Sequence, residues 1–555
     1  MTPTPETLAL LDHTWEVAES AKKHRARKRA EPPLIRLWDG DFEQCALVRN
    51  PISASFTWIM NDTGHGRLVL DYEDKLGQWL VDPWGREKQN VHITADKDGA
   101  RWAGRLAASS IVREEGKPRY IIAQFLHDYE ELKYVALWAN PVMPATLQFP
   151  KTFILAGPTK WVALFALALN NFRYEGNLWQ IPDDLLDPTT WFDGVQPWKW
   201  QIRVQPHSLL ADNSLWTIAH ARFQTWHDVF APKLRDAGLM VVTRRWIEGD
   251  PAPYPGAICK NGNLFIDIVD KSGVFEGTAL AGNIFAGLYR SIVKIAGDGF
   301  TELITDLGVP TDTPEHPLAS WLGTSPHNPW VIYRDGAHSN TQSNVQSFKW
   351  TWQPATAATI TIGGKSAPGI NEAAEAGIKI VGDIFSNLLL GQGGIGDILN
   401  TILKPFYSDT LAAWVSIKHP LRPRKLGRYH YREIIASTSQ QAMTLSMVMA
   451  IKSALWATRA RSTHVVQVAD GAPYLIGDNG QGHYFLGDRI GIAVEGLPSG
   501  QIMVEQVTEI TYALGRESRG WAVTVGDPRS QEEPTMHALR QIRELTGSLH
   551  DLGLL

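Results

Sequence analysis

Residues 363–404 read GGKSAPGINEAAEAGIKIVGDIFSNLLLGQGGIGDILNTILK, and this stretch separates two β-rich parts of the chain. It is rich in Gly and aliphatic residues, and Phe385 is its only aromatic residue. Apolar residues from Ile378 to Leu389 recur at helical spacing, and apolar spacing resumes at Ile398. The glycines between these two runs interrupt a helix, because Gly in a helix interior costs about 1 kcal/mol relative to Ala. The pattern predicts two short amphipathic helices around a glycine hinge.

Three interpretations of this apolar segment are open: a buried helical hairpin between two halves of the protein, a mobile plug, and a loop that touches a membrane. A helical apolar stripe usually faces a core, which favours the first. Asp383 and Asp397 interrupt the stretch, and a membrane-spanning helix needs about 18 consecutive apolar residues, so we expect no transmembrane helix. The candidate plug or membrane-contact residues are Ile384, Phe385, Leu388, Leu389, Leu390, Ile395, Ile398 and Leu399.

The composition is that of a large globular protein. The 555 residues are enough for several domains, and contents of 44% hydrophobic and 20% charged residues predict a substantial core. The net charge of −5 gives no bulk attraction to nucleic acid, and we expect no sequence-specific nucleic-acid binding. Two cysteines, Cys45 and Cys259, are too few for a disulfide framework or a Cys-based zinc site. The 22 Trp favour a component of an assembly, because Trp is enriched in interfaces.

Strand patterns lie on both sides of the apolar segment. Residues 34–130 contain short alternating runs, a hairpin at 91–112 with Asp98-Gly99 in its turn, and a second hairpin through 115–118. This spacing predicts a small antiparallel barrel or sandwich. Residues from about 420 to 530 return to β, with a hairpin around Asn479-Gly480 and strands at 503–514 and 521–527.

Between and beyond these β units the chain alternates helices and strands. A helix that begins at Pro158 is predicted to have one apolar face. A second helix at 226–237 is predicted to end at Gly238. The apolar face of the first helix is formed by Trp161, Leu164, Phe165, Ala168 and Phe172. Strands are predicted at 240–247, 264–270, 330–335 and 347–352, and helices around 408–418, 438–459 and 534–547.

The expected fold class is therefore α+β and multidomain. The chain is expected to divide into six parts. They are an N-terminal helix and basic linker at 1–33, a β unit at 34–130, a mixed Trp-rich domain at 131–350, the Gly-rich apolar hinge at 351–407, helices with a second β unit at 408–530, and a C-terminal helix at 531–555.

A basic run follows the first predicted helix, which covers residues 1–21. A secretory signal carries its charge before the apolar stretch, so this order predicts no signal peptide. The run is interpreted either as a solvated linker or helix end, or as a docking contact for an acidic partner surface. Its candidate docking residues are Lys22, Lys23, Arg25, Arg27, Lys28 and Arg29.

The sequence shows no motif of a known catalytic site. HExxH, G-x-S-x-G and Cys-x-x-Cys patterns are all missing. Asp128 with Glu130 and Glu131 is the best acidic cluster, but a glycosidase needs two carboxylates facing each other across a cleft. Adjacent glutamates in a short helix point apart, so we interpret them as surface residues. We expect no catalytic, cofactor-binding or metal-binding residue, and the sequence leaves a hydrolase activity open.

Several stretches, in this order along the chain, resemble the minor tail proteins of long-tailed actinobacterial phages, in particular those taken to be tail hubs. No single stretch is diagnostic; their order over nearly the whole chain carries the resemblance. They include RLWDGDFE at 36–43, GRLVLDYEDKLGQWL at 66–80, RWAGRL at 101–106, LHDYEELKYVALWANPVMPATLQFPKTFILAGP at 126–158, IDIVDKSGVFEGT at 266–278, GRYHYREI at 427–434 and GAPYLIGDNGQGHYFLGDRIG at 471–491.

The resemblance implies a structural virion protein at the tip of a non-contractile tail, without a cofactor. Tail hubs have two β-barrel domains of the tail-tube type, and three subunits form a pseudo-hexameric ring. The two β units at 34–130 and about 420–530 fit that plan. The implied partners are two further copies of the chain, the distal tail protein and other tail-tip proteins, the tape measure protein, and the host membrane or cell wall. In this picture residues 363–404 lie near the closed tip. The resemblance leaves a receptor- or wall-binding tail protein and a tail-borne peptidoglycan hydrolase as alternatives.

Overall fold

The computed structural model describes sixteen parts of the chain, and every structural statement below refers to them. They are residues 5–116, 118–150, 152–176, 186–189, 191–212, 214, 216–271, 331–334, 345–363, 414–419, 422–437, 458, 461–469, 474–493, 503–515 and 519–526. The predicted plug segment, the helices at 438–459 and 534–547 and the C-terminal segment 531–555 lie outside this description.

The described chain is mostly β with a few helices. The helices are α1 (Pro5–Ala30), α2 (Lys75–Val81), α3 (Thr159–Glu175), α4 (Trp226–Ala237) and α10 (Arg422–Leu426), with short 3₁₀ helices η1 (Asp128–Lys133), η2 (Ala145–Leu147), η3 (Asp193–Val195), η4 (Pro197–Lys199) and η5 (Leu209–Ala211). The first twelve strands are β1 (Leu34–Trp38), β2 (Cys45–Val48), β3 (Ser53–Ile59), β4 (His65–Asp71), β5 (His92–Lys97), β6 (Ala100–Val112), β7 (Tyr120–His127), β8 (Phe153–Pro158), β9 (Ile202–Val204), β10 (Trp216–Ala221), β11 (Leu239–Arg245) and β12 (Leu264–Asp270). The later strands are β13 (Ile332–Arg334), β14 (Val345–Gln353), β15 (Thr359–Gly363), β16 (Trp414–Lys418), β17 (Glu433–Ser437), β18 (Arg461–Ala469), β19 (Arg489–Ala493), β20 (Met503–Leu514) and β21 (Arg519–Val525).

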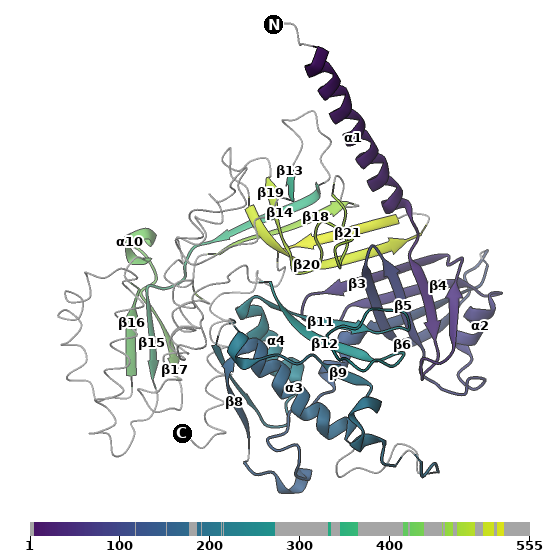
Figure 1. Ribbon diagram of the computed structural model, residues 1–555. Helices are drawn as coiled ribbons and strands as arrows, with labels where there is room; N and C mark the ends of the chain where they lie inside the picture. The colour runs from purple at the N-terminus through teal and green to yellow at the C-terminus, as the bar shows by residue number, and fades with distance from the viewer. Residues whose placement is uncertain are drawn as a thin grey trace.

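One 13-stranded sheet joins the two β units (Figure 1). Its main path runs β14-β18-β21-β20-β3-β4-β7-β6-β5-β1-β2, and the connection between the units is the antiparallel pairing of β3 with β20. Within the described strands this path stays open, from β14 at one end to β2 at the other. One hydrophobic core covers both units, since Phe56 and Trp102 of the first unit belong to the same buried cluster as Tyr512 and Val523 of the second.

The two predicted hairpins of the first unit are confirmed. β5 pairs with β6 through the Asp98-Gly99 turn, and β6 pairs with β7. Asp98 has φ 49° and Gly99 has φ 78°, the left-handed conformation that Gly and Asp tolerate in tight two-residue turns. The local turn chemistry therefore sets the register of this part of the sheet.

The turn at Asn479-Gly480 is also present, with φ of 49° and 75°. Its flanks do not form the predicted hairpin, because Ile476 and Tyr484 make only an isolated parallel bridge. The strand that follows, β19, pairs with β20 and β13 instead. We call residues 474–488 the turn segment below.

The middle part packs around its own core. α3 and α4 lie beside the pair β8–β10 and the three-stranded sheet β11-β12-β9 (Figure 1). α4 covers the predicted residues and ends at left-handed Gly238, as predicted from the sequence; the structure adds that the Thr225 side chain caps its start.

The predicted apolar face of α3 is confirmed for Leu164, which is 3% exposed, and wrong for its aromatic residues Phe165 and Phe172. Phe165 and Phe172 are 42% and 41% exposed, whereas Val162, Ala166 and Leu167 on the other side are buried. The prediction assigned Phe165 and Phe172 to the apolar face because their side chains are large and aromatic. The buried face consists of small and aliphatic residues, which allow the helix to approach its sheet closely.

A further correction concerns residues 408–418, predicted as a helix. Trp414–Lys418 form strand β16, which pairs antiparallel with β15, while β17 pairs parallel with β15 on its other side. β16 is an edge strand whose only described neighbour, β15, lies about 50 positions earlier in the sequence, so local patterns did not reveal the pairing. The small sheet β16-β15-β17 lies apart from the large one (Figure 1).

Candidate functional site

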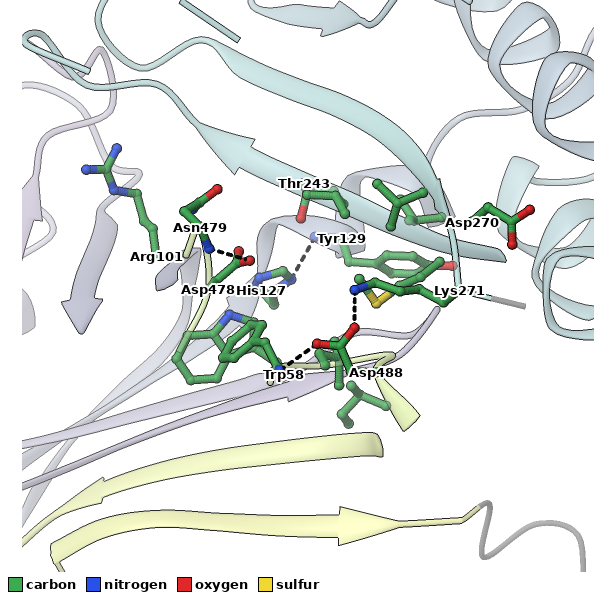
Figure 2. Close-up of a pocket in the computed structure, with 17 residues that line it drawn as sticks. Trp58, Arg101, His127, Tyr129, Thr243, Asp270, Lys271, Asp478, Asn479 and Asp488 are labelled. Carbon is green, nitrogen blue, oxygen red and sulfur yellow. Dashed lines mark hydrogen bonds and ion pairs between the residues drawn. The ribbon is translucent and has the colours of Figure 1, made fainter. Parts of the chain in front are cut away.

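The most distinctive site is a cavity of about 370 Å³ where three parts of the chain meet (Figure 2). The large sheet contributes Trp58 and Arg101, the β11–β12 pair contributes Thr243 and Lys271, and the turn segment contributes side chains from Asp478 to Asp488. No sequence pattern predicted that these segments meet.

Asp488 connects the turn segment to the middle part. Its carboxylate accepts a hydrogen bond from Lys271 Nζ and, at 2.8 Å, another from the backbone N–H of Phe485 (Figure 2). The Gln506 side chain donates to the Gly487 carbonyl at 2.8 Å. The Asp488 carboxylate thus orders its own loop and also forms an ion pair with Lys271, which directly follows β12.

Arg101 is held on the opposite wall. Its guanidinium contacts Asp96 and Asp250, and Nη1 donates to the Arg245 carbonyl at 3.0 Å. The pKa of Arg101 is raised: burial acts to lower it, but the hydrogen bonds to Asp250 and Asp96 outweigh that effect. Arg101 is therefore occupied by partners of this chain.

Below the cavity, Arg245 and Asp128 form a buried ion pair. Burial by itself would raise the pKa of Asp128, but the charge and hydrogen bonds of Arg245 hold it below its usual range. Burial lowers the pKa of His127, to about 4, and that of His92, to about 3. Both histidines are thus neutral at pH 7, and His127 Nδ1 accepts from the Tyr129 N–H to cap η1.

The acidic cluster expected at the surface is partly buried. Asp128 is 4% exposed, and Glu130 and Glu131, which were interpreted as surface residues, are half-buried. The two glutamates point apart as expected: Glu130 contacts Thr63 and Lys133, and Glu131 contacts Arg105. Each carboxylate has its own cation or donor, an arrangement that joins segments and does not form a pair of carboxylates across a cleft.

Three further local features belong to the described residues. Asp39-Gly40-Asp41 forms a turn in which Asp39 Oδ1 accepts from the Glu43 N–H at 2.9 Å. Among the described residues, no cluster of three His, Cys, Asp or Glu side chains could hold a metal ion. In the same residues, no helix is long and apolar enough to cross a membrane.

The basic run lies on α1, which extends as one helix through Ala30 and projects from the sheet (Figure 1). Its last turn is bound to the protein: Lys28 Nζ donates to Gln481 Oε1 at 2.8 Å, and Arg519 donates to the Ala30 carbonyl at 2.6 Å. Lys22, Lys23 and Arg27 are exposed, whereas Arg25, Lys28 and Arg29 are half-buried. Of the two solvated forms that were considered, the structure shows the helix end and not the linker.

Asn61 is a buried residue that joins the large sheet to β11, and sequence reasoning missed it. Its amide donates to the Leu239 carbonyl at 2.8 Å and accepts from the Val241 N–H at 2.9 Å. Asn61 has φ 54°, a conformation that Asn adopts more readily than most residues. The Asn-Asp-Thr-Gly turn at 61–64 was the only hint available in the sequence.

The described residues form a β-rich scaffold in which buried charges join distant segments. The class of protein follows from the comparisons. The chain belongs to the family described as Siphovirus ReqiPepy6 Gp37-like protein, whose model matches residues 34–527. The resemblance to phage minor tail proteins is thereby confirmed at the level of the family.

Two curated relatives cover almost the whole chain. It is 32% identical over 588 residues to minor tail protein Gp28 of Mycobacterium phage L5, covering 98% of each protein. It is 32% identical over 596 residues to minor tail protein Gp28 of Mycobacterium phage D29, covering 99% of each. The crystal structure of the tail protein from Neisseria meningitidis MC58 is also similar, with 9% identity, a TM-score of 0.39, and coverage of 90% of this chain and 97% of that one. A TM-score of this size is too low to carry an argument.

Proposed function

We propose that the chain is a tail hub at the tip of a non-contractile phage tail, where it closes the tail tube and helps DNA pass into the host cell. The observation that best supports this role is the β3–β20 pairing, which unites both β units in one sheet with one core. A continuous sheet of this size suits a protein that builds a wall. In the proposed assembly each β unit is a tube-type barrel domain, and β13 and β14 are added to the second unit because both belong to the large sheet.

The proposed oligomer is a homotrimer. The main path of the described sheet runs from β14 to β2. A sheet that continues from copy to copy around a lumen leaves few free edges, and cyclic symmetry closes such a ring. Three copies with two β units each would match a hexameric tube.

Proposed partners are the distal tail protein, other tail-tip proteins and the tape measure protein. Lys22, Lys23 and Arg27 on the exposed side of α1 are candidates for docking on an acidic surface. The predicted plug residues, Ile384 to Leu399, stay a proposal for closing the lumen or touching the host membrane.

Light scattering on the intact purified protein tests the assembly. A mass about three times 61.8 kDa supports the trimeric hub, and a monomer that stays monomeric with the purified distal tail protein contradicts it. In the trimer, Phe385→Asp should spare oligomerisation and lower DNA delivery. A variant that fails to fold would favour the buried-hairpin interpretation over the plug.

A receptor- or wall-binding role is the second candidate. It is favoured by exposed aromatic side chains around η3 and η4, among them Phe192 at 70% and Trp198 at 53% exposed, which could stack on sugars. Binding of the isolated protein to host cells that Trp198→Ala abolishes would support it. A clear zone in a zymogram on host peptidoglycan would instead support the hydrolase alternative.

A further inference from the structure

The outer edge of β11 borders the cavity. In the described part of the chain, β11 is the end strand of the sheet β11-β12-β9. Four consecutive residues of β11, from Met240 to Thr243, line the cavity. Because each face of a strand shows only alternate residues, a consecutive run indicates that the cavity lies along the edge of the strand. Figure 2 shows Thr243 and Trp58 on opposite sides of this space.

Two side chains occupy the ends of this edge. The Asn61 carboxamide donates to the Leu239 carbonyl and accepts from the Val241 N–H, as one residue of a parallel neighbouring strand would. At the other end, Arg101 Nη1 donates to the Arg245 carbonyl. The backbone between Val241 and Arg245 is left for another partner.

Thr243 lies in that gap, and its N–H and C=O point into it. In a strand, the backbone groups of alternate residues point to the same edge, so those of Thr243 point the same way as those of Val241 and Arg245. The even-numbered residues use the opposite edge, as the bond from the Lys271 N–H to the Gly238 carbonyl at 3.0 Å shows. The hydrogen bonds within the described chain leave both backbone groups of Thr243 open. Thr243 is half-buried, where an unpaired backbone group is costly unless water or a ligand bonds to it.

The two open groups of Thr243 select the chemistry of a ligand. In an extended peptide the N–H and C=O of one residue point to the same side, so a residue opposite Thr243 can accept from its N–H and donate to its C=O. A single trans amide, such as the acetamido group of a sugar, points its N–H and C=O to opposite sides and can make only one of these bonds. The cavity volume of about 370 Å³ is at the small end of ligand pockets, which usually measure about 300–1,000 Å³, and suits a short segment.

The charges and openings of the wall favour an internal peptide segment over a free chain end. The two cations of the wall, Lys271 and Arg101, already form ion pairs with residues of this chain. The wall also contains three carboxylates, those of Asp270, Asp478 and Asp488. A terminal carboxylate would therefore be repelled. The wall reaches solvent at two places, since Asn479 is exposed and the side chains of Lys271 and Asp488 are 24% and 34% exposed.

We propose that the cavity binds an extended peptide segment of about three residues, whose middle residue pairs with Thr243 as an added strand on β11. The opposite wall offers apolar contacts to the side chains of the peptide through Trp58, Phe485 and Leu486. The inference does not depend on the chain being a tail hub.

Saturation-transfer difference NMR on the full chain tests the proposal with the blocked peptide acetyl-Ala-Val-Ala-N-methylamide. We expect signals from the valine methyl groups. A peptide with an N-methylated valine lacks the N–H that would bond to the Thr243 carbonyl, and its signals should be about fivefold weaker. The same tripeptide with a free carboxylate should also give weaker signals, and N-acetylglucosamine should give none. No signal from the blocked peptide, or an equal signal from any of the other three ligands, overturns the proposal.

Filling the cavity supplies a second measurement. Leu486→Trp should remove the signals of the blocked peptide, because Leu486 lines the cavity and is 7% exposed. Leu210→Trp is the matched control, at a residue that is 79% exposed, and should leave the signals unchanged. If Leu486→Trp does not fold, a peptide with photo-leucine in place of valine locates the site on the wild-type chain. Its adducts should lie at 240–243, at 485–488 or at Trp58. Adducts elsewhere, or unchanged signals with folded Leu486→Trp, would overturn the proposal.

Discussion

Arg245 at the end of β11 and Asp128 at the start of η1 form a bidentate buried ion pair: Nε lies 2.9 Å from Oδ2, and Nη2 lies 2.7 Å from Oδ1. Arg245 Nη1 donates as well to the Gly262 carbonyl at 2.9 Å. The pair therefore joins the first β unit to the middle part at a place from which water is excluded.

Removing one partner of this pair should be strongly destabilising. Asp128→Asn leaves the Arg245 charge buried without its counter-ion, and breaking a buried pair in this way costs about 3–5 kcal/mol. Urea unfolding of the wild type and variant measures the loss. Asp228→Asn is the matched control, because Asp228 is an exposed residue of α4 whose loss should cost about 1 kcal/mol. Equal losses for the two variants would contradict a special role for the buried pair.

Stability should fall as the pH falls below about 6.5, the ordinary pKa of His. Burial lowers the pKa of His127 to about 4 and that of His92 to about 3, so the unfolded chain takes up protons that the folded chain does not. Arg245 and Arg105 oppose a charge on His92, whereas Asp128 and Asp41 favour it. The free energy of unfolding should therefore decrease from pH 6.5 down to about pH 4.

His127→Asn tests this origin of the pH dependence. Asn can still accept the η1 cap bond from the Tyr129 N–H but does not titrate. Unfolding of the variant should therefore take up about one proton fewer, which makes the slope of the unfolding free energy against pH shallower. Urea unfolding at pH 7, 6 and 5 gives the slope. A slope equal to that of the wild type would exclude His127 as a contributor.

Two glycines with similar backbone conformations should respond differently to Ala. Gly99 has φ +78°, and an added Cβ would lie 2.2 Å from the Asp478 carbonyl oxygen, whereas Gly116 has φ +74° and open space around it. Gly116→Ala should cost about 1–2 kcal/mol from backbone strain alone. Gly99→Ala should cost more, because it also separates the β5–β6 turn from the turn segment. Thermal unfolding midpoints compare the two, and an equal decrease would show that the close approach is unimportant.

Lys97 should control how firmly α1 is held. It is 6% exposed, and its Nζ donates to the Lys28 carbonyl at 2.7 Å and to Asp98 Oδ1 at 3.0 Å. Lys97→Met removes both bonds, each worth about 1.5–3 kcal/mol for a charged group, and should loosen the last turn of α1. Limited trypsin digestion should then cut the basic run several times faster. Lys88→Met, at an exposed ion pair with Asp41, is the control and should leave the rate unchanged.

Local patterns in the sequence determined several elements of this protein. The Asp98-Gly99 turn, the α4 boundaries at Thr225 and Gly238, and most strands of the first β unit were predictable. Their causes lie within a few residues: turn conformations that only some residues tolerate, caps that satisfy free N–H groups, and the alternation of a half-buried strand. Short stretches in a fixed order along the chain likewise predicted the family.

Tertiary structure alone decided the rest. The β3–β20 pairing makes one sheet from strands some 450 positions apart, as in the Thr57–Thr511 contact, and the Asp128–Arg245 pair joins residues 117 positions apart. Tertiary structure also decided that residues 414–418 form a strand paired with β15. It decided as well which face of α3 is buried. A residue's sequence neighbours specify its conformation but not its distant partner, since that choice depends on how whole surfaces fit and which charges they bury. The cavity and the ion pairs around it arise at this level.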